Sequence, residues 1–119
     1  MAMNLTPIER EDQIDTLLAE SSDQPVVIFK FSLTCGTSTY AADEIDRYLA
    51  GEPASARYAV VTVQTHRELS NAIAARLGVR HETPQVLVVR DGRVSWHASH
   101  FRVTVDELTE ALTAVPAAR

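Results

Sequence analysis

An apolar strand gives way to a helix within the stretch Phe29-Lys30-Phe31-Ser32-Leu33-Thr34-Cys35-Gly36-Thr37-Ser38. This stretch holds the only cysteine of the chain. A thiol on the first turn of a helix lies near backbone N–H groups and the positive end of the helix dipole, and both favour the thiolate. The position of Cys35 therefore predicts a reactive thiol. The alternative is a packed core thiol with no reaction of its own.

The sequence on either side of this stretch alternates between helical and strand-like patterns. Continuous β-branched and apolar runs predict buried strands over residues 25–32, 58–63, 86–89 and about 94–99. Asp91-Gly92 lies between the last two runs and is a strong hairpin signal. Helical spacing predicts a helix before each of the first three strands and one after the fourth.

Capping residues and helix breakers mark the ends of these four helices. The first helix is expected to start between residues 7 and 12, with Thr6 and Glu9 at capping-box spacing. The same spacing recurs at Thr65 and Glu68, and at Thr104 and Glu107. The three later helices are predicted to end at Gly51, Gly78 and Pro116, respectively. Their inward-facing positions are Ala41, Ile45, Tyr48 and Leu49 in the second helix, Leu69, Ala72, Ile73 and Leu77 in the third, and Val105, Leu108, Leu112 and Val115 in the fourth.

The resulting element order predicts one domain over residues 1–119. Two βα crossovers followed by a hairpin and a covering helix make a mixed sheet of about four strands with helices on both faces. The expected fold class is therefore a three-layer α/β/α domain.

Composition excludes several classes of function. With 119 residues, 45% of them hydrophobic, the chain can build one core, and its net charge of -5 argues against a nucleic-acid partner. No apolar run is long enough to cross a bilayer, and the N-terminus does not look like a secretion signal. One cysteine permits no internal disulfide and no thiolate metal cluster. We expect a cytoplasmic protein, monomeric or weakly dimeric, with no bound cofactor and no metal.

Ser38 completes a Cys-x-x-Ser motif, so a hydroxyl occupies the position where a dithiol enzyme keeps its second thiol. A hydroxyl can hydrogen-bond a thiolate but cannot close a disulfide. Any redox cycle must therefore be monothiol and pass through a mixed disulfide with an outside partner. A lower thiol pKa also lowers intrinsic nucleophilicity, so the net rate gain is only about 2- to 4-fold. Recognition of the partner disulfide must supply the rest.

Thr83-Pro84 precedes the strand that should lie beside the cysteine-bearing one. A proline at this point gives up a ladder donor, and a cis Thr83–Pro84 bond is one way to accommodate it. In cis, the Thr83 backbone would face the thiol and could pair with an extended substrate. A trans proline in an ordinary loop is the alternative. Several cations could border the site, namely Lys30, Arg80, His81 and Arg102.

Taken together, these residues resemble a family. Cys35 after a buried strand, Thr83-Pro84 before another, Asp91-Gly92 and a closing helix look like a thioredoxin-like domain. More narrowly, the chain resembles the monothiol bacilliredoxins of the bacillithiol system. The matching stretches lie between about Leu5 and about Leu112 and comprise residues 26–30, 70–74, 78–86 and 97–101, of which the last two are the most specific.

The resemblance implies that Cys35 is the nucleophile that attacks a protein–bacillithiol mixed disulfide. It also implies that Cys35 then carries bacillithiol, the co-substrate, until a second thiol removes it. Ser38 matches the hydroxyl of the family and is assigned with Cys35 to the catalytic pair. Substrate contacts are expected from Thr34, Gly36, Thr37, Thr83, Pro84, Arg80 and His81. The partners implied are bacillithiolated proteins and a low-molecular-weight thiol.

The chain departs from the family pattern around the motif. Phe31-Ser32-Leu33 stands where the family commonly has His-Ser-Thr, and Gly36-Thr37 stands where it has Pro or Ser followed by Ile. Two other functions remain open at this point. One is a thioredoxin-fold binding module with a non-catalytic cysteine, and the other is a monothiol redoxin that uses glutathione, coenzyme A or a protein disulfide.

Overall fold

A computed structural model describes residues 5–32 and 36–113 of the chain. The expectations for Thr34, Cys35, Val115 and Pro116 lie outside the described residues, as does the side chain of Thr37. The elements, in chain order, are β1 (Thr6–Pro7), α1 (Glu11–Glu20), β2 (Val26–Phe31), α2 (Gly36–Ala50), β3 (Arg57–Thr62), α3 (Arg67–Leu77), β4 (Gln85–Arg90), β5 (Arg93–Ser99), the 3₁₀ turn η1 (His100–Arg102) and α4 (Val105–Thr113).

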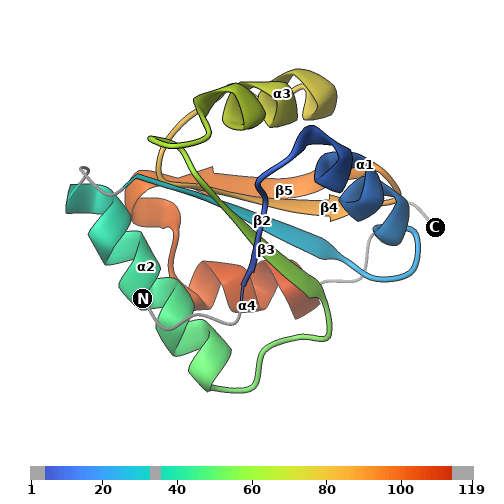
Figure 1. The fold of residues 1–119 in the computed structure, drawn as a ribbon. Helices are drawn as coiled ribbons and strands as arrows, with labels where there is room; N and C mark the ends of the chain where they lie inside the picture. Colours follow the sequence, from blue (N-terminus) through green and yellow to red (C-terminus); the bar gives the residue numbers. More distant parts are fainter. Residues whose placement is uncertain (1–4, 33–35, 114–119) are drawn as a thin grey trace.

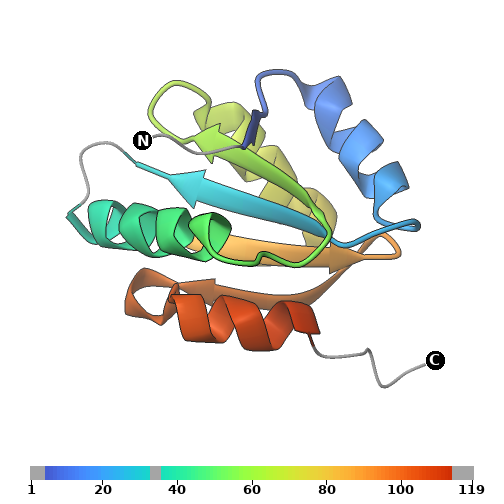
Figure 2. The same cartoon turned by 90° about the horizontal axis from the view of Figure 1, so that it is seen from below.

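The five strands form one mixed sheet in the order β1-β3-β2-β4-β5. β3 runs parallel to β1 and β2, whereas β4 runs antiparallel to β2 and β5. Helices α1 and α3 cover one face of the sheet, and α2 and α4 cover the other (Figures 1 and 2). The three-layer α/β/α architecture expected from the sequence is confirmed, with one more strand than the four expected.

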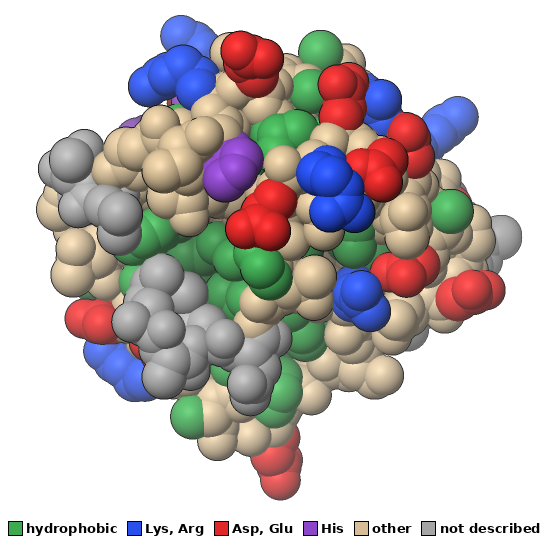
Figure 3. Space-filling model, viewed as in Figure 1, with side chains coloured by type: hydrophobic (Ala, Val, Ile, Leu, Met, Phe, Trp, Pro, Cys, Tyr) green, Lys and Arg blue, Asp and Glu red, His purple; other side chains and the backbone are tan. Residues whose placement is uncertain are grey.

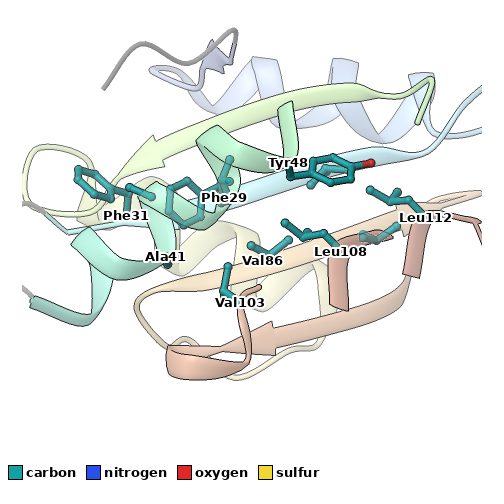
Figure 4. Close-up of a cluster of buried hydrophobic side chains, with 12 residues drawn as sticks. Phe29, Phe31, Ala41, Tyr48, Val86, Val103, Leu108 and Leu112 are labelled. Atoms are coloured by element: carbon teal, nitrogen blue, oxygen red, sulfur yellow. The ribbon is translucent and has the colours of Figure 1, made fainter. Parts of the chain in front are cut away.

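Two hydrophobic clusters lie on the two faces of the sheet. β2 contributes to both, because all six of its residues are buried and successive side chains point to opposite faces. Phe29 and Phe31 face α2 and α4, and Figure 4 shows them beside Ala41 and Tyr48 of α2. Val26 and Ile28 face α1 and α3. The continuous apolar run therefore marks a central strand covered on both sides, as predicted.

The start of the chain differs from the expectation. Thr6 and Pro7 form β1, which pairs with Ala59 and Val60 of β3, and Ile8 donates its N–H to Val60 O at 2.8 Å. The capping-box pattern at Thr6 therefore does not begin a helix. α1 starts four residues later, where the Gln13 side chain accepts from the Arg10 N–H at 2.8 Å. The expected starting range of 7–12 holds, but the predicted cap is wrong.

Of the other two capping predictions, one is confirmed and one is wrong. Thr104 caps α4, because its Oγ1 accepts from the Glu107 N–H at 3.1 Å. α3 begins at Arg67 after His66, with no side-chain cap. The Thr65 hydroxyl instead lies 2.8 Å from Nδ1 of His66.

The hairpin turn at Asp91 and Gly92 is anchored to the end of α1. The Asp91 N–H donates to Ser21 O at 2.9 Å, and the Gly92 N–H donates to Ser21 Oγ at 2.8 Å. Both turn residues have a positive φ, as this kind of hairpin requires. One end of the sheet is therefore fixed by internal hydrogen bonds.

Acidic and basic side chains are intermixed over α1 and α3 (Figure 3). Arg76 of α3, for example, pairs with Asp15 and Glu11 of α1. In the same view, hydrophobic side chains gather in a hollow between α2 and the sheet. None of the described helices has the length and apolar character needed to cross a membrane.

Candidate active site

Five elements meet at the end of the sheet opposite the hairpin. β2 ends at Phe31, α2 begins at Gly36, β4 begins at Gln85, and β5 runs through Ser99 into η1. The segment that carries Cys35 lies between β2 and α2 in the chain. Figure 1 shows this end of the sheet, with the start of α2 beside η1. The structure thus gathers several of the predicted site segments at one end of the molecule.

The pairing of β2 with β4 brings Thr83-Pro84 to this end. Lys30 is the antiparallel partner of Gln85, so the residues just before Gln85 lie beside those that lead from Phe31 toward α2. The Thr83–Pro84 peptide bond is cis, and Pro84 is buried. Thr83 and Ser32 are thus neighbours in space although they are far apart in the chain.

The loop that precedes β4 is fixed by polar contacts at almost every residue. Arg80 O accepts from Gln85 Nε2 at 3.0 Å, and Pro84 O accepts from the His100 N–H at 3.0 Å. The Glu82 carboxylate accepts from the Ser99 hydroxyl. Within the described residues, Thr83 makes no hydrogen bond. Its role as a substrate-binding edge stays a prediction.

Ser38 lies in the first turn of α2 and is fully buried. Its Oγ accepts from the Ser32 N–H at 3.1 Å, which ties the end of β2 to the start of α2. Ser38 therefore ties the first turn of α2 to the residue that follows β2. Its assigned role as a hydrogen-bond donor to the thiolate stays a prediction.

A buried polar cluster lies behind the site, on the α1 and α3 face of the sheet. The Lys30 side chain is fully buried, and its Nζ donates to Ser70 O of α3 at 3.1 Å and lies 3.3 Å from Nδ1 of His81. The Ser70 hydroxyl lies 3.0 Å from the same His81 nitrogen. No carboxylate among the described residues pairs with Lys30. Lys30, one of the cations that could border the site, is therefore buried behind it.

Burial and neighbouring charges lower the pKa of both basic side chains in this cluster. Burial lowers the pKa of Lys30 from 10.5 to about 8. The pKa of His81 is also lowered, first by burial and then by the positive charges of Lys30 and Arg67, although Glu82 acts in the opposite direction. At neutral pH, His81 is therefore an uncharged imidazole whose Nδ1 can accept from both donors. One ring nitrogen of His81 anchors the loop, so substrate contact stays a prediction for the other.

Basic residues surround Glu82 at the edge of the site. The pKa of the Glu82 carboxyl is lowered, first by the hydrogen bond from Ser99 and then by the charges of His100, Arg80 and His97. Arg80 is exposed, and its assignment as a substrate contact stays a prediction. Arg102 is turned toward α4, where its guanidinium lies 3.6 Å from the carboxylate of Glu107.

A family model described as monothiol bacilliredoxin BrxC matches residues 6–108. The chain belongs to this family. As a bacilliredoxin family member, it has the thioredoxin-like fold expected from the sequence.

Solved structures agree on the fold. A protein described as a candidate oxidoreductase with a thioredoxin fold superimposes with a TM-score of 0.79 and 28% identity, over 90% of this chain and 92% of that one. Thioredoxin from Fasciola hepatica gives a TM-score of 0.71 and 19% identity, over 92% and 97% of the two chains. Mitochondrial thioredoxin 3 from Saccharomyces cerevisiae gives 0.71 and 12%, over 93% and 95%.

Sequence reasoning missed the cluster behind the site in this bacilliredoxin family member. The available signal was a single charged residue, Lys30, inside a run of buried apolar residues. A lysine at such a position needs a partner, and His81 is one of three titratable side chains in the loop that precedes β4. Periodicity alone gave no reason to connect the two.

Proposed function

We propose that this protein is a monothiol thiol-disulfide oxidoreductase that removes bacillithiol from protein mixed disulfides. The observation that carries the proposal is the match to the monothiol bacilliredoxin family over residues 6–108, in a chain whose only cysteine directly precedes α2. The open backbone of Thr83 beside this position supports it, because a disulfide substrate needs a place to bind.

The reaction balances without an added oxidant. The Cys35 thiolate attacks the bacillithiol sulfur of the client's mixed disulfide, a Cys35–bacillithiol disulfide forms, and the client leaves as a thiolate. A second thiol, deprotonated, then attacks the bacillithiol sulfur and releases the Cys35 thiolate. Each step breaks one S–S bond and forms another. Because Ser38 cannot form a disulfide, the second thiol must come from outside the chain.

α2 supports both steps through its position. Its first turn supplies backbone N–H groups and the positive end of the helix dipole, which stabilise Cys35 as the attacking thiolate and again as the leaving group. The hydrogen bond from Ser32 to Ser38 Oγ fixes the approach of β2 to this turn. Client recognition is assigned to Thr83, whose backbone can pair with an extended peptide.

The decisive experiment is loading of Cys35 followed by intact-mass spectrometry. The reduced protein is mixed with a single-thiol client that carries bacillithiol, and in parallel with the same client carrying glutathione or coenzyme A. We expect a mass increase equal to bacillithiol minus two hydrogen atoms, with release of client thiol, fastest in the first reaction. The variant Cys35→Ser is the matched control and must show neither.

The other outcomes decide between the alternatives. Faster loading from the glutathione or coenzyme A client would make the protein a monothiol redoxin of a different thiol system. No loading from any client, together with undiminished partner binding by Cys35→Ala, would leave a thioredoxin-fold binding module with an inert cysteine. Either result rejects the proposed bacillithiol reaction.

A further inference from the structure

Two large aromatic side chains are exposed at the edge of the candidate active site. Tyr40 of α2 is 38% exposed and Phe101 of η1 is 67% exposed. Their rings contact each other edge to face, with centroids 5.4 Å apart and an interplanar angle of 62°. They are the large hydrophobic side chains that are exposed among the described residues. Such a pair on the surface is typical of a binding site.

The pair lies next to the residues that surround the cysteine. Tyr40 is one helical turn beyond Gly36, the residue that follows Cys35. η1 packs beside the start of α2 (Figures 1 and 2), and the backbone of His100 is bonded to Pro84 O. The aromatic pair and the Thr83-Pro84 edge therefore flank the same end of the sheet.

His100 adopts an unusual backbone conformation that brings Phe101 to this position. Its φ is 56°, in the left-handed region that non-glycine residues avoid. The other described non-glycine residue with positive φ is Asp91, and the hairpin turn accounts for it. His100 has no hairpin to explain it. Strained residues of this kind persist where the surrounding structure holds them, and they cluster at functional sites.

Basic side chains lie near Glu82, whose carboxylate accepts from Ser99, two residues before Phe101. His100 precedes Phe101 in the chain, and His100, His97 and Arg80 are all near enough to Glu82 to act on its carboxyl. The Ser99 hydroxyl also holds that carboxylate. The surface beside the rings thus offers several donors for an anion and one carboxylate for an ammonium group.

Resting on the proposed function, we propose that Tyr40 and Phe101, together with His100 and Arg80, form the subsite for the glucosamine–malate body of bacillithiol. The attacked sulfur belongs to bacillithiol and must align between Cys35 and the departing client sulfur. The rest of the bacillithiol molecule therefore lies against surfaces that flank Cys35, whereas the client is farther out. The aromatic pair is one of these flanking surfaces.

The chemistry of the four residues matches this ligand. The C–H groups of a sugar ring carry slight positive charge and pack against the negative face of an aromatic ring. The malate carboxylates suit the planar donors of Arg80 and the imidazole of His100. Glutathione and cysteine lack a sugar ring, so the aromatic pair would favour bacillithiol over them.

The first test compares transfer from a bacillithiolated client with transfer from the same client carrying only cysteine. For Phe101→Leu we expect kcat/KM to fall about 3- to 10-fold on the bacillithiolated client and less than about 2-fold on the cysteinylated one. Phe101→Tyr retains the ring and should retain the preference. Arg80→Gln should lower the same preference, with a loss that shrinks at high salt.

The second test has no catalytic readout. Glucosaminyl-malate, which lacks the cysteinyl thiol, is titrated into Cys35→Ser while the ring resonances of Tyr40 and Phe101 are followed by NMR. We expect saturable shifts that Phe101→Leu abolishes for Tyr40. Glucosamine and malate added separately should shift the rings less.

The two proposals fail in different ways. If Cys35 is loaded with bacillithiol but Phe101→Leu shows no selective loss and the rings do not respond, the subsite is rejected and the oxidoreductase stands. If glucosaminyl-malate shifts the rings but no disulfide loads Cys35, the subsite stands as a binding site and the reaction is rejected.

Discussion

Nζ of Lys30 lies 3.3 Å from Nδ1 of His81, although the two residues are 51 positions apart in the chain. The contact joins the C-terminal end of the central strand β2 to the loop that carries Thr83. Because Ser70 of α3 touches both side chains, three elements are held together directly behind the candidate active site. The buried cluster thus positions the loop that carries Thr83.

Replacing Lys30 by Met tests the cost of the buried charge. Because no described carboxylate pairs with Lys30, we expect Lys30→Met to keep the stability of the wild type near pH 7 or to raise it by about 1–3 kcal/mol. The difference in stability between the wild type and Lys30→Met should also depend on pH. The folded protein loses the Lys30 proton at about pH 8, whereas the unfolded chain keeps it up to the ordinary value of 10.5.

Between these pH values the unfolded state holds more protons, so the wild type gains stability relative to Lys30→Met as pH rises. The gain totals about 3 kcal/mol and is lost again as pH falls through 8. Urea unfolding of both proteins at several pH values measures it. Taking the difference cancels other titrating groups, among them Tyr58, whose pKa is raised by burial and by Tyr48. Parallel stability curves would show that Lys30 titrates normally.

Removal of the His81 ring should loosen the loop before β4. His81→Ala leaves the buried Lys30 ammonium and the Ser70 hydroxyl without their shared partner, so we expect a loss of about 1–3 kcal/mol in the free energy of unfolding. Thr83 then loses its fixed position, and kcat/KM for a mixed disulfide should fall more than thiol reactivity toward iodoacetamide. Ser95→Ala, a change on β5, is a control for general destabilisation. Equal losses in both reactions would contradict the positioning role.

Acid should destabilise the protein partly through the same histidine. The pKa of His81 is lowered in the folded state, mainly by burial, so the unfolded chain binds a proton in a range where the folded protein does not. Stability is therefore expected to fall as pH decreases below about 6.5, down through the lowered pKa. Thermal unfolding of wild type and His81→Gln over this range measures the effect. A dependence that is unchanged in the variant would assign it to other groups.

Two substitutions at Ser38 test two different properties. One tests the hydrogen bond to Ser32, and the other tests whether a thiol at this position can resolve the mixed disulfide. Ser38→Ala removes the acceptor for the Ser32 N–H and is expected to cost about 1 kcal/mol of stability. Ser38→Cys restores a dithiol motif. We expect its oxidised form to lose the mass of two hydrogen atoms and to accumulate less bacillithiol on Cys35, because the new thiol resolves the mixed disulfide internally. Persistent bacillithiol loading of Ser38→Cys would show that the buried position is out of reach.

Glu44 of α2 holds α4 in place. Its Oε1 accepts from the Val105 N–H at 2.9 Å, at the first residue of α4, and its other oxygen lies 3.2 Å from Arg47. Glu44→Ala should cost about 1 kcal/mol, whereas Glu44→Gln keeps an acceptor and should cost less. Chemical denaturation measures both. Similar losses for the two variants would show that charge, and not the acceptor, stabilises the helix.

Much of the fold could be predicted because its signals are local. The strands are continuous apolar runs, and the inward positions of α2 and α4 follow helical spacing. β1 was missed because Thr6-Pro7 is also typical of a helix start, and only pairing with β3 decides between the two. The helix cap predicted at Thr65 is wrong because the Thr65 hydroxyl lies against Nδ1 of His66 instead.

The candidate site was predictable in part for the same reason. Thr83 and Ser38 could be assigned from the chain alone, because Thr83 directly precedes a proline and Ser38 follows the cysteine by three residues. The Lys30–His81 contact and the Tyr40–Phe101 pair depend on how distant elements pack. No spacing in the chain encodes either of them.

The polar side chains of Lys30 and Gln85, where β2 ends and β4 begins, also disfavour a shifted pairing of the two strands. Lys30 and Gln85 are direct partners and face the same side of the sheet, opposite the Phe29 and Phe31 rings. A slip of β4 by one residue would turn the Gln85 amide into the aromatic cluster and separate His81 from Lys30. Every other residue paired in this ladder is apolar and would tolerate the exchange far better. Alignment of the two strands, and with it the meeting of Thr83 with the cysteine-bearing segment, is thus specified by the least hydrophobic pair in the centre of the protein.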